Sequence, residues 1–458
     1  GSAIPRRRRC SMQRRWAVLS IVACVALFAL HGQRNAAVRW QQPRKKGCEE
    51  IECADSTGLP PASSRSGELA SMCAQPEFVH AALNATIVVF AWRRLESIRR
   101  LLRSLRDAEY CRMRVPLVIM ADAGADEDVV AYARSFNWTH GPMTLTLHEG
   151  QPLGIRGMWI RMFRTHSDRN LLPFEDDIEV SPLFWWWLVR AVREYGPLES
   201  DAQVRAKQLA GIALYTPRLN EIQYPQVHWR PSREGGVRAH ALLLQVPCSW
   251  GALFFSAYIA DFLRFYDVRS QPPFYDFADE ARQTGAGKDR QALGDSRVRL
   301  PNARCNTWAR SWKRFLIDFM FGRGLVMLYP SFDGEHCFAT TYMERGGHSG
   351  KDGKVETISL SQLRRDLDPY KTPPLALPGA FEHMRRQLDS RTGLPSWERL
   401  PVFSVHHNRR EHLGVLAATG RSFLAKVRQR GAETNVAPLY DRLVALWGDP
   451  HAPETAAA

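Results

Sequence analysis

The first 46 residues of this 458-residue chain contain no aspartate or glutamate, although they contain 11 arginines and lysines. Of the formal net charge of +15, therefore, +11 lies in this segment and only about +4 in the remaining residues. So small an excess gives no argument for a nucleic-acid-binding surface on the rest of the chain, and we expect no nucleic-acid partner. A basic start without acids is typical of a membrane-targeting segment.

The sequence also lacks the spacings of zinc sites and any internal repeat. It has no CxxC pair, and His406, His407 and His412 do not fit the HExxH pattern. Two N-glycosylation sequons, at Asn84 and Asn137, fit exposure in the secretory pathway. Some cysteines should pair in that compartment, but their spacing leaves the connectivity open. Seven cysteines follow residue 31: Cys48, Cys53, Cys73, Cys111, Cys248, Cys305 and Cys337.

An uncharged apolar run over residues 16–30 follows the arginine-rich residues. It is short for a spanning helix, which usually needs about 20 residues, but thin early secretory membranes tolerate less. Basic residues before the run favour a cytoplasmic N-terminus. We expect a cytoplasmic tail over residues 1–15, a type II signal-anchor over residues 16–31 and a lumenal stem over residues 32–79. A cleaved signal peptide and a transit peptide are the alternatives.

The residues after the stem predict a β-α-β unit. Residues 85–91 (ATIVVFA) and 115–120 (VPLVIM) are typical of buried strands, and residues 95–106 between them show helical spacing. The two strands should be parallel. Asp122 follows the second strand, at the position where such folds hold a nucleoside. The alternative is an aspartate that only forms a turn before Gly124.

Three consecutive acids follow a later apolar run over residues 171–174. They are Glu175, Asp176 and Asp177, and Ser181 is placed to cap a helix that begins after them. A strand, an acidic tip and a helix in this order put the carboxylates at the carboxyl edge of a sheet. Adjacent carboxylates repel one another, and a divalent cation relieves the repulsion. The alternative is a solvated turn whose acids favour the helix N-terminus.

The stretch FEDDIEVSPLFWWWL resembles the acidic motif of GT-A glycosyltransferases, most closely the Golgi N-acetylglucosaminyltransferase I family. In that family, too, E-D-D is followed by a hydrophobic residue, E-V, a small residue, proline and aromatics. TIVVFAWRRLESIRRLL and PLVIMADAG are similar to the N-terminal strand–helix–strand of the same enzymes. The resemblance covers about residues 83–190. It implies an α/β fold of GT-A type, a Rossmann-type mixed sheet flanked by helices, over residues 80–350. An α-rich extension would follow over residues 351–458.

The resemblance also implies an activity. The chain would transfer a sugar from a nucleotide-sugar, a UDP-sugar, to a hydroxyl of a glycan or glycoprotein in the lumen of the Golgi or ER, with Mn²⁺ or Mg²⁺. Asp177 would coordinate the metal. Glu175 and Asp176 would lie near the ribose, Asp122 near the uracil, and Arg93 among the residues that contact uridine.

Three further segments are candidates for donor contacts. Arg156 lies in a glycine-rich loop, which can fold over a nucleotide. By resemblance Trp250 and Gly251 would lie near the donor sugar, and the alternative is a core tryptophan beside a strand glycine. By resemblance His348 would ligate the metal or hold the pyrophosphate as imidazolium, and the alternative is a surface histidine.

The catalytic base is the point at which the sequence departs from the family. The paired acids of the relatives fall on Lys313 and Arg314. Asp318, one helical turn later in a helix predicted over residues 308–324, and Glu344 are the candidates for the base. An ion pair of Asp318 with a neighbouring basic residue of its helix is equally compatible with the spacing. Without a base, a retaining reaction with leaving-group assistance stays open.

Two other functions compete with a glycosyltransferase. One is a catalytically silent lumenal module that binds a glycan or nucleotide, which the departure at Lys313 and Arg314 favours. The other is a metal-dependent phosphohydrolase that uses the acids at 175–177. It would need a second set of carboxylates or histidines to hold two metals, and no such set stands out in the sequence.

Overall fold

The computed structural model describes one unit of the chain, which lies within Pro60–Ala458. The predicted cytoplasmic tail, the anchor and, apart from Cys73, the stem lie outside the described residues. Within the described part, no helix has the length and apolar character needed to cross a membrane. The described residues are 73, 83–195, 201–220, 227–229, 240–272, 274, 310–332, 335–342, 375–389, 395–405 and 412–448.

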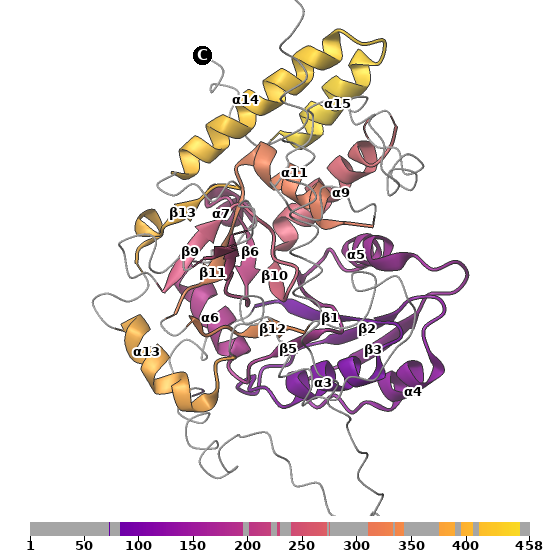
Figure 1. Ribbon diagram of the computed structural model, residues 1–458, viewed down its shortest axis with the longest axis vertical. Helices are drawn as coiled ribbons and strands as arrows, with labels where there is room; N and C mark the ends of the chain where they lie inside the picture. The colour runs from indigo at the N-terminus through magenta and orange to yellow at the C-terminus, as the bar shows by residue number, and fades with distance from the viewer. Residues whose placement is uncertain are drawn as a thin grey trace, which may run out of the picture. The chain divides into compact units, whose positions relative to one another are not determined.

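A nine-stranded mixed sheet forms the centre of this unit (Figure 1). Its strand order is β13-β9-β11-β6-β10-β4-β1-β2-β3. Strands β3, β2, β1 and β4 are parallel to one another, β10 is antiparallel, and β6 and β11 again run with β4. The strands are β1 (Ala85–Ala91), β2 (Leu117–Ala121), β3 (Met143–Leu147), β4 (Asn170–Phe174), β6 (Leu209–Ala213), β9 (Ala241–Leu244), β10 (Ala252–Phe254), β11 (Val326–Pro330) and β13 (Val402–Phe403).

Helices cover both sides of the sheet. Figure 1 shows α3 and α4 on one side of strands β1–β3 and α5 on the other. Two short ladders lie outside the main sheet: β5 (Ile178–Val180) with β12 (Ala339–Thr341), and β7 (Leu219–Asn220) with β8 (Val227–His228). The helices are α3 (Leu95–Arg106), α4 (Glu127–Ser135), α5 (Gly154–Thr165), α6 (Phe184–Tyr195), α7 (Asp201–Ala206), α9 (Ser256–Arg269), α11 (Lys313–Arg323), α13 (Phe381–Asp389), α14 (Leu413–Ala432) and α15 (Ala437–Trp447).

The predicted mixed α/β sheet with flanking helices is confirmed, and it is compatible with a Rossmann-like fold. The β-α-β prediction is confirmed, because β1 pairs with β2 in parallel and α3 has the predicted bounds. Helix α11 ends as predicted at Gly324, which has a φ of 67°. The predictions omitted α9, α15 and β9, whose apolar residues do not follow a single clear period.

Ser181 lies buried three residues before α6 and forms hydrogen bonds with segments that are distant in the sequence. Its Oγ accepts a hydrogen bond from the backbone N–H of Leu183 at 3.0 Å and donates one to the carbonyl of Ala376. The three tryptophans of α6 that follow are all buried, and the indole of Trp187 stacks on Phe338. This burial of aromatic surface attaches α6 to the sheet.

The described residues beyond 351 belong to the same packed structure as the sheet. Strand β13 pairs with β9, and α14 packs on α11. The contact between α14 and α11 is close because glycines face it: a Cβ on Gly420 would lie 2.5 Å from the carbonyl oxygen of Gly322. The indole N–H of Trp447 donates a hydrogen bond to the carbonyl of Asp318.

A buried ion cluster joins α9, α11 and α7. Asp261 accepts from Arg205 and Arg323, each at 2.7 Å, and from Arg264. Burial alone would raise the pKa of Asp261, but hydrogen bonds from Arg323 and Arg205 outweigh it and lower the pKa to about 2. Arg323 also donates to the carbonyls of Leu446 and Trp447, so the cluster holds the end of α15.

The contact between α14 and α11 can be tested with two glycines of one helix. In Gly420→Ala the new methyl group would meet the carbonyl oxygens of Phe321 and Gly322, which cannot move independently of α11. We expect the free energy of unfolding to fall by about 1–3 kcal/mol. Gly414→Ala has no atom within 4 Å of its Cβ and is the control. It should be neutral or stabilising by up to about 1 kcal/mol. Equal chemical-denaturation midpoints for both variants would contradict the close contact.

Candidate functional site

The order of the strands creates a switch point between β1 and β4. From β1 the chain proceeds to β2 and β3 on one side, and it later adds β4 on the other side of β1. Strands β1 and β4 are parallel, with Val89 opposite Phe174 near their carboxyl ends. Residues 92–94 therefore leave β1 beside the acid loop (residues 175–177), which leaves β4. Open α/β sheets bind their ligands at such a switch point.

Arg94 pairs with two of the three acids. Its guanidinium donates to both carboxylate oxygens of Asp176, with Nε 3.0 Å from Oδ2. Its Nη1 lies 3.8 Å from Oδ2 of Asp177. Asp176 is buried, so this two-point contact compensates its charge where water cannot. Asp176 is therefore a structural partner of β1 in this geometry.

Glu175 faces an aromatic stack. Its Oε1 accepts a hydrogen bond from the indole N–H of Trp159 at 3.2 Å. The indole of Trp159 stacks on Trp312, with ring centroids 3.6 Å apart. Burial and the charge of Asp177 raise the pKa of Glu175 to about 8, against the opposing hydrogen bond from Trp159.

Asp177 lies at the surface end of the acid loop. Its side chain is 23% exposed, more than the 10% of Asp176. Its backbone oxygen accepts from the N–H of Tyr342, directly after β12, so the small β5–β12 ladder fixes the loop. A carboxylate of this kind offers the hard oxygen ligand that Mn²⁺ and Mg²⁺ prefer, and substrate phosphates commonly complete such sites. Asp177 therefore fits the predicted metal role.

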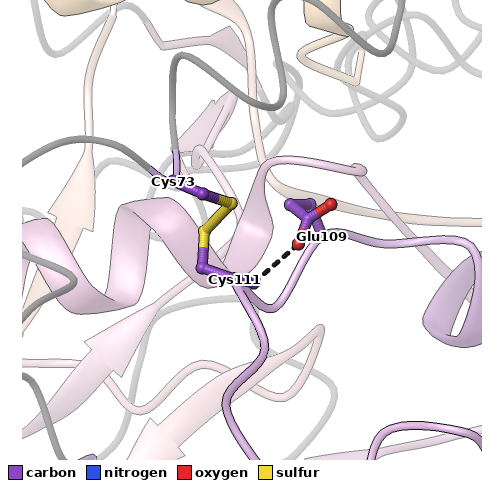
Figure 2. A group of neighbouring side chains, drawn as sticks. All are labelled: Cys73, Glu109 and Cys111. Carbon is purple, nitrogen blue, oxygen red and sulfur yellow. Dashed lines mark hydrogen bonds between the residues drawn. A yellow bond between two sulfur atoms is a disulfide. The ribbon is translucent and has the colours of Figure 1, made fainter.

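One group of three potential ligands lies elsewhere in the described part of the chain. It consists of Cys73, Glu109 and Cys111 (Figure 2). The two cysteines are joined in a disulfide, so neither supplies a thiolate. The carboxylate of Glu109 accepts the N–H of Cys111 at 2.7 Å. This group is a cross-link between the segment before β1 and the loop after α3.

Asp122 has its carboxylate engaged by backbone. Oδ1 accepts the N–H groups of Ala123 and Leu153, and Oδ2 accepts that of Gly154 at 2.8 Å. Gly154 is the first residue of α5, so Asp122 holds the start of α5 against the end of β2. Its predicted contact with uracil stays a prediction, but its placement at the carboxyl edge of β2 agrees with the β-α-β reasoning.

Arg93 lies in the segment after β1, and Arg156 lies in α5. Arg93 stacks over Trp92, with its guanidinium carbon 4.2 Å from the ring centroid, and donates to the carbonyl of Gly124. Arg156 is in the first turn of α5. Burial raises the pKa of Tyr266 on α9, and the charge of Arg156 opposes this rise, so Arg156 lies near that phenol.

Trp250 and Gly251 lie next to the acid loop. Gly251 has a φ of 86°, and a Cβ there would be 3.0 Å from both Phe174 and Ala339. Phe174 immediately precedes Glu175, and Ala339 begins β12. The ring of Trp250 contacts Tyr215, and Nζ of Lys313 lies 5.7 Å from its centroid. The structure therefore brings these two residues together with the acid loop.

Asp318 lies in the packed interior. Its carboxylate accepts from Arg269 of α9 at 3.0 Å, and both side chains are nearly inaccessible. Asp318 is thus part of an ion pair, as the alternative to a catalytic role predicts, and Arg269 of α9 is a partner that the spacing within its own helix did not indicate. A carboxylate held in this way is poorly suited to take a proton from a substrate. Glu344 and His348 lie outside the described residues.

Residues that sequence reasoning missed complete the site. Their side chains contribute charge or aromatic contacts in and around the acid loop. Among them only Arg94 had a signal in the sequence, and it was weak: Arg94 directly follows Arg93. The aromatic residues had no such signal, because they lie on segments that follow the acid loop or precede it by many residues. These residues are Arg94, Trp159, Trp312, Lys313 and Tyr342.

No family model matches this sequence, and a comparison with curated protein sequences finds no significant match.

The buried pair of Asp318 and Arg269 predicts a stability effect. In Asp318→Ala the guanidinium of Arg269 would lose its buried carboxylate, and we expect the free energy of unfolding to fall by about 3–5 kcal/mol. Asp441→Ala is the matched control, because it breaks an exposed pair with Arg428 and should cost about 0–1 kcal/mol. Thermal unfolding of both variants measures the difference. An Asp318→Ala protein as stable as the wild type would show that the ion pair is not formed.

Proposed function

We propose that this chain is a metal-dependent glycosyltransferase of GT-A type. It would move a sugar from a nucleotide-sugar, a UDP-sugar, to a hydroxyl of a glycan or glycoprotein. The observation that supports this most is the acid loop at the switch point of the sheet, with Asp177 at the accessible end and Trp250 and Gly251 beside it. This end of the sheet has the position in which open α/β folds hold nucleotides.

Each residue has a separate part in this proposal. Asp177 would hold Mn²⁺ or Mg²⁺ together with the diphosphate of the donor. The bound metal would supply Lewis-acid stabilisation of the leaving group. Arg94 holds the carboxylate of Asp176 at two points, so the acid loop would present a fixed face to the ribose. Gly251 is buried, and without a side chain it can lie close against Phe174 and Ala339, which leaves the partly exposed Trp250 as the residue that would contact the donor sugar.

In the proposed transfer one bond forms and one bond breaks. The acceptor oxygen forms a bond to the anomeric carbon, and the bond from that carbon to the phosphate oxygen breaks, with its electron pair leaving on the nucleoside diphosphate. In an inverting reaction the acceptor proton passes to a general base. Because Asp318 is held in a buried ion pair, Glu344 is the stronger of the two candidates for the base.

A donor screen tests the proposal. Residues 60–458, secreted from a eukaryotic host, are incubated with individual UDP- and GDP-sugars and glycan acceptors, and nucleotide release is measured. We expect release from one donor with Mn²⁺ and none with EDTA. Asp177→Ala should lower the rate at least about 100-fold, since one protein ligand of the metal is lost. Asp168→Ala, at an exposed site paired only weakly with Arg169, should leave it unchanged.

A silent binding module is the second candidate, and the burial of Asp318 in an ion pair is the observation that favours it. It predicts metal-dependent binding of a nucleotide without turnover against any acceptor mixture. A chain that binds no nucleotide in the presence of Mn²⁺ would overturn both the glycosyltransferase and a nucleotide-binding module, and a chain that also binds no glycan would overturn the silent module altogether.

We also propose that the described unit faces the lumen of the Golgi or ER, held by the predicted anchor at residues 16–31. Two observations support this. Cys73 and Cys111 form a disulfide, which persists in oxidising compartments. Both sequon asparagines, Asn84 and Asn137, are exposed.

The lumenal location predicts N-glycosylation. When the full chain is expressed in eukaryotic cells, treatment with a glycosidase that removes N-glycans should increase its gel mobility. Asn84→Gln and Asn137→Gln should each remove part of this shift, and the double variant should remove it entirely. Both asparagines are exposed, so neither substitution reaches the core. A chain whose mobility is insensitive to the enzyme would count against lumenal exposure.

A further inference from the structure

The start of α11 reaches the acid loop through an aromatic stack. Trp312, immediately before α11, stacks on Trp159 with a tilt of 15° between the rings. Trp159 in turn donates its indole N–H to Glu175. Trp159 and Trp312 are both buried, so this stack has a fixed position.

A second set of contacts leads to the same place. Lys313, the first residue of α11, has its Nζ 5.7 Å from the centre of the Trp250 ring. Trp250 is followed by Gly251, which contacts Phe174, the residue before Glu175. Two separate sets of side-chain contacts therefore connect the start of α11 with the acid loop.

The acid loop needs positive charge once a diphosphate binds. Three carboxylates already face this edge of the sheet, and the donor adds negative charge on both of its phosphates. Arg94 is engaged by Asp176, and Arg93 lies along the β2–α4 loop with Gly124 and Asp126. Lys313 is partly exposed and approaches from the side of Trp250. A lysine binds phosphate as a point charge without requiring a fixed fork geometry.

We propose that Lys313 binds the diphosphate of the nucleotide-sugar. This inference rests on the proposed function and assigns a ligand-binding role to a residue that stands where the related enzymes would have an acid. The start of α11 would then bind the leaving group and would not supply the catalytic base. The cation of Lys313 and the metal at Asp177 would then both contact the diphosphate.

Isothermal titration calorimetry with Mn²⁺ present distinguishes phosphate binding by Lys313 from a general loss of nucleotide binding. The probes are UDP, UMP and uridine, because only the first has the second phosphate. In Lys313→Gln we expect the Kd of UDP to rise at least about tenfold, as for the loss of a hydrogen bond to a charged group. The Kd of UMP should rise less and that of uridine should not change. Lys313→Arg should retain most of the affinity for UDP.

Lys426→Gln is the matched control, since Lys426 is an exposed lysine of α14. It should bind all three probes like the wild type. If Lys313→Gln binds UDP as tightly as the wild type, or weakens UDP and uridine equally, the assignment of Lys313 is overturned while the proposed function stands. If the wild type binds none of the nucleotides, the proposed function itself fails.

Discussion

The two-point contact between Arg94 and Asp176 is the interaction on which the candidate site depends. Three adjacent carboxylates cannot all remain ionised at a buried sheet edge without compensation. Arg94 neutralises Asp176, Trp159 donates to Glu175, and Asp177 is left at the accessible end of the loop. Three chemically similar side chains thereby acquire three environments. Arg94 lies in the segment that follows β1, and the acids lie in the loop that follows β4. The same contact therefore also joins the ends of the two strands that flank the switch point.

Helix α11 connects this site to the C-terminal helices. Its first residues lie against Trp159 and Trp250 at the acid loop. Its last residue, Arg323, is held by Asp261 and by the carbonyls at the end of α15. The C-terminal helices are thereby linked to the acid loop through α11, and in the contacts described above none of their residues touches the acid loop.

The elements that lead into the site were predictable because their signals are local. The β-branched run of β1, the amphipathic pattern of α3 and Gly324 at the end of α11 each act within a few residues. The partners of the acids were not predictable. Arg94 and Asp176 are 82 positions apart, and Arg269 and Asp318 are 49 apart. No periodicity connects such pairs, so an ion pair for Asp318 could be expected but its arginine could not be named.

The sequence by itself determined β1, α3, the parallel β1–β2 pair and the position of three acids at the end of a buried strand, since hydrophobic period and chain order express these directly. Only the tertiary structure decided which acid stays accessible, which aspartate is part of the interior and which cation lies beside Trp250. Those outcomes depend on desolvation and on charges from elements distant in the chain, and both arise only when the sheet and helices are packed.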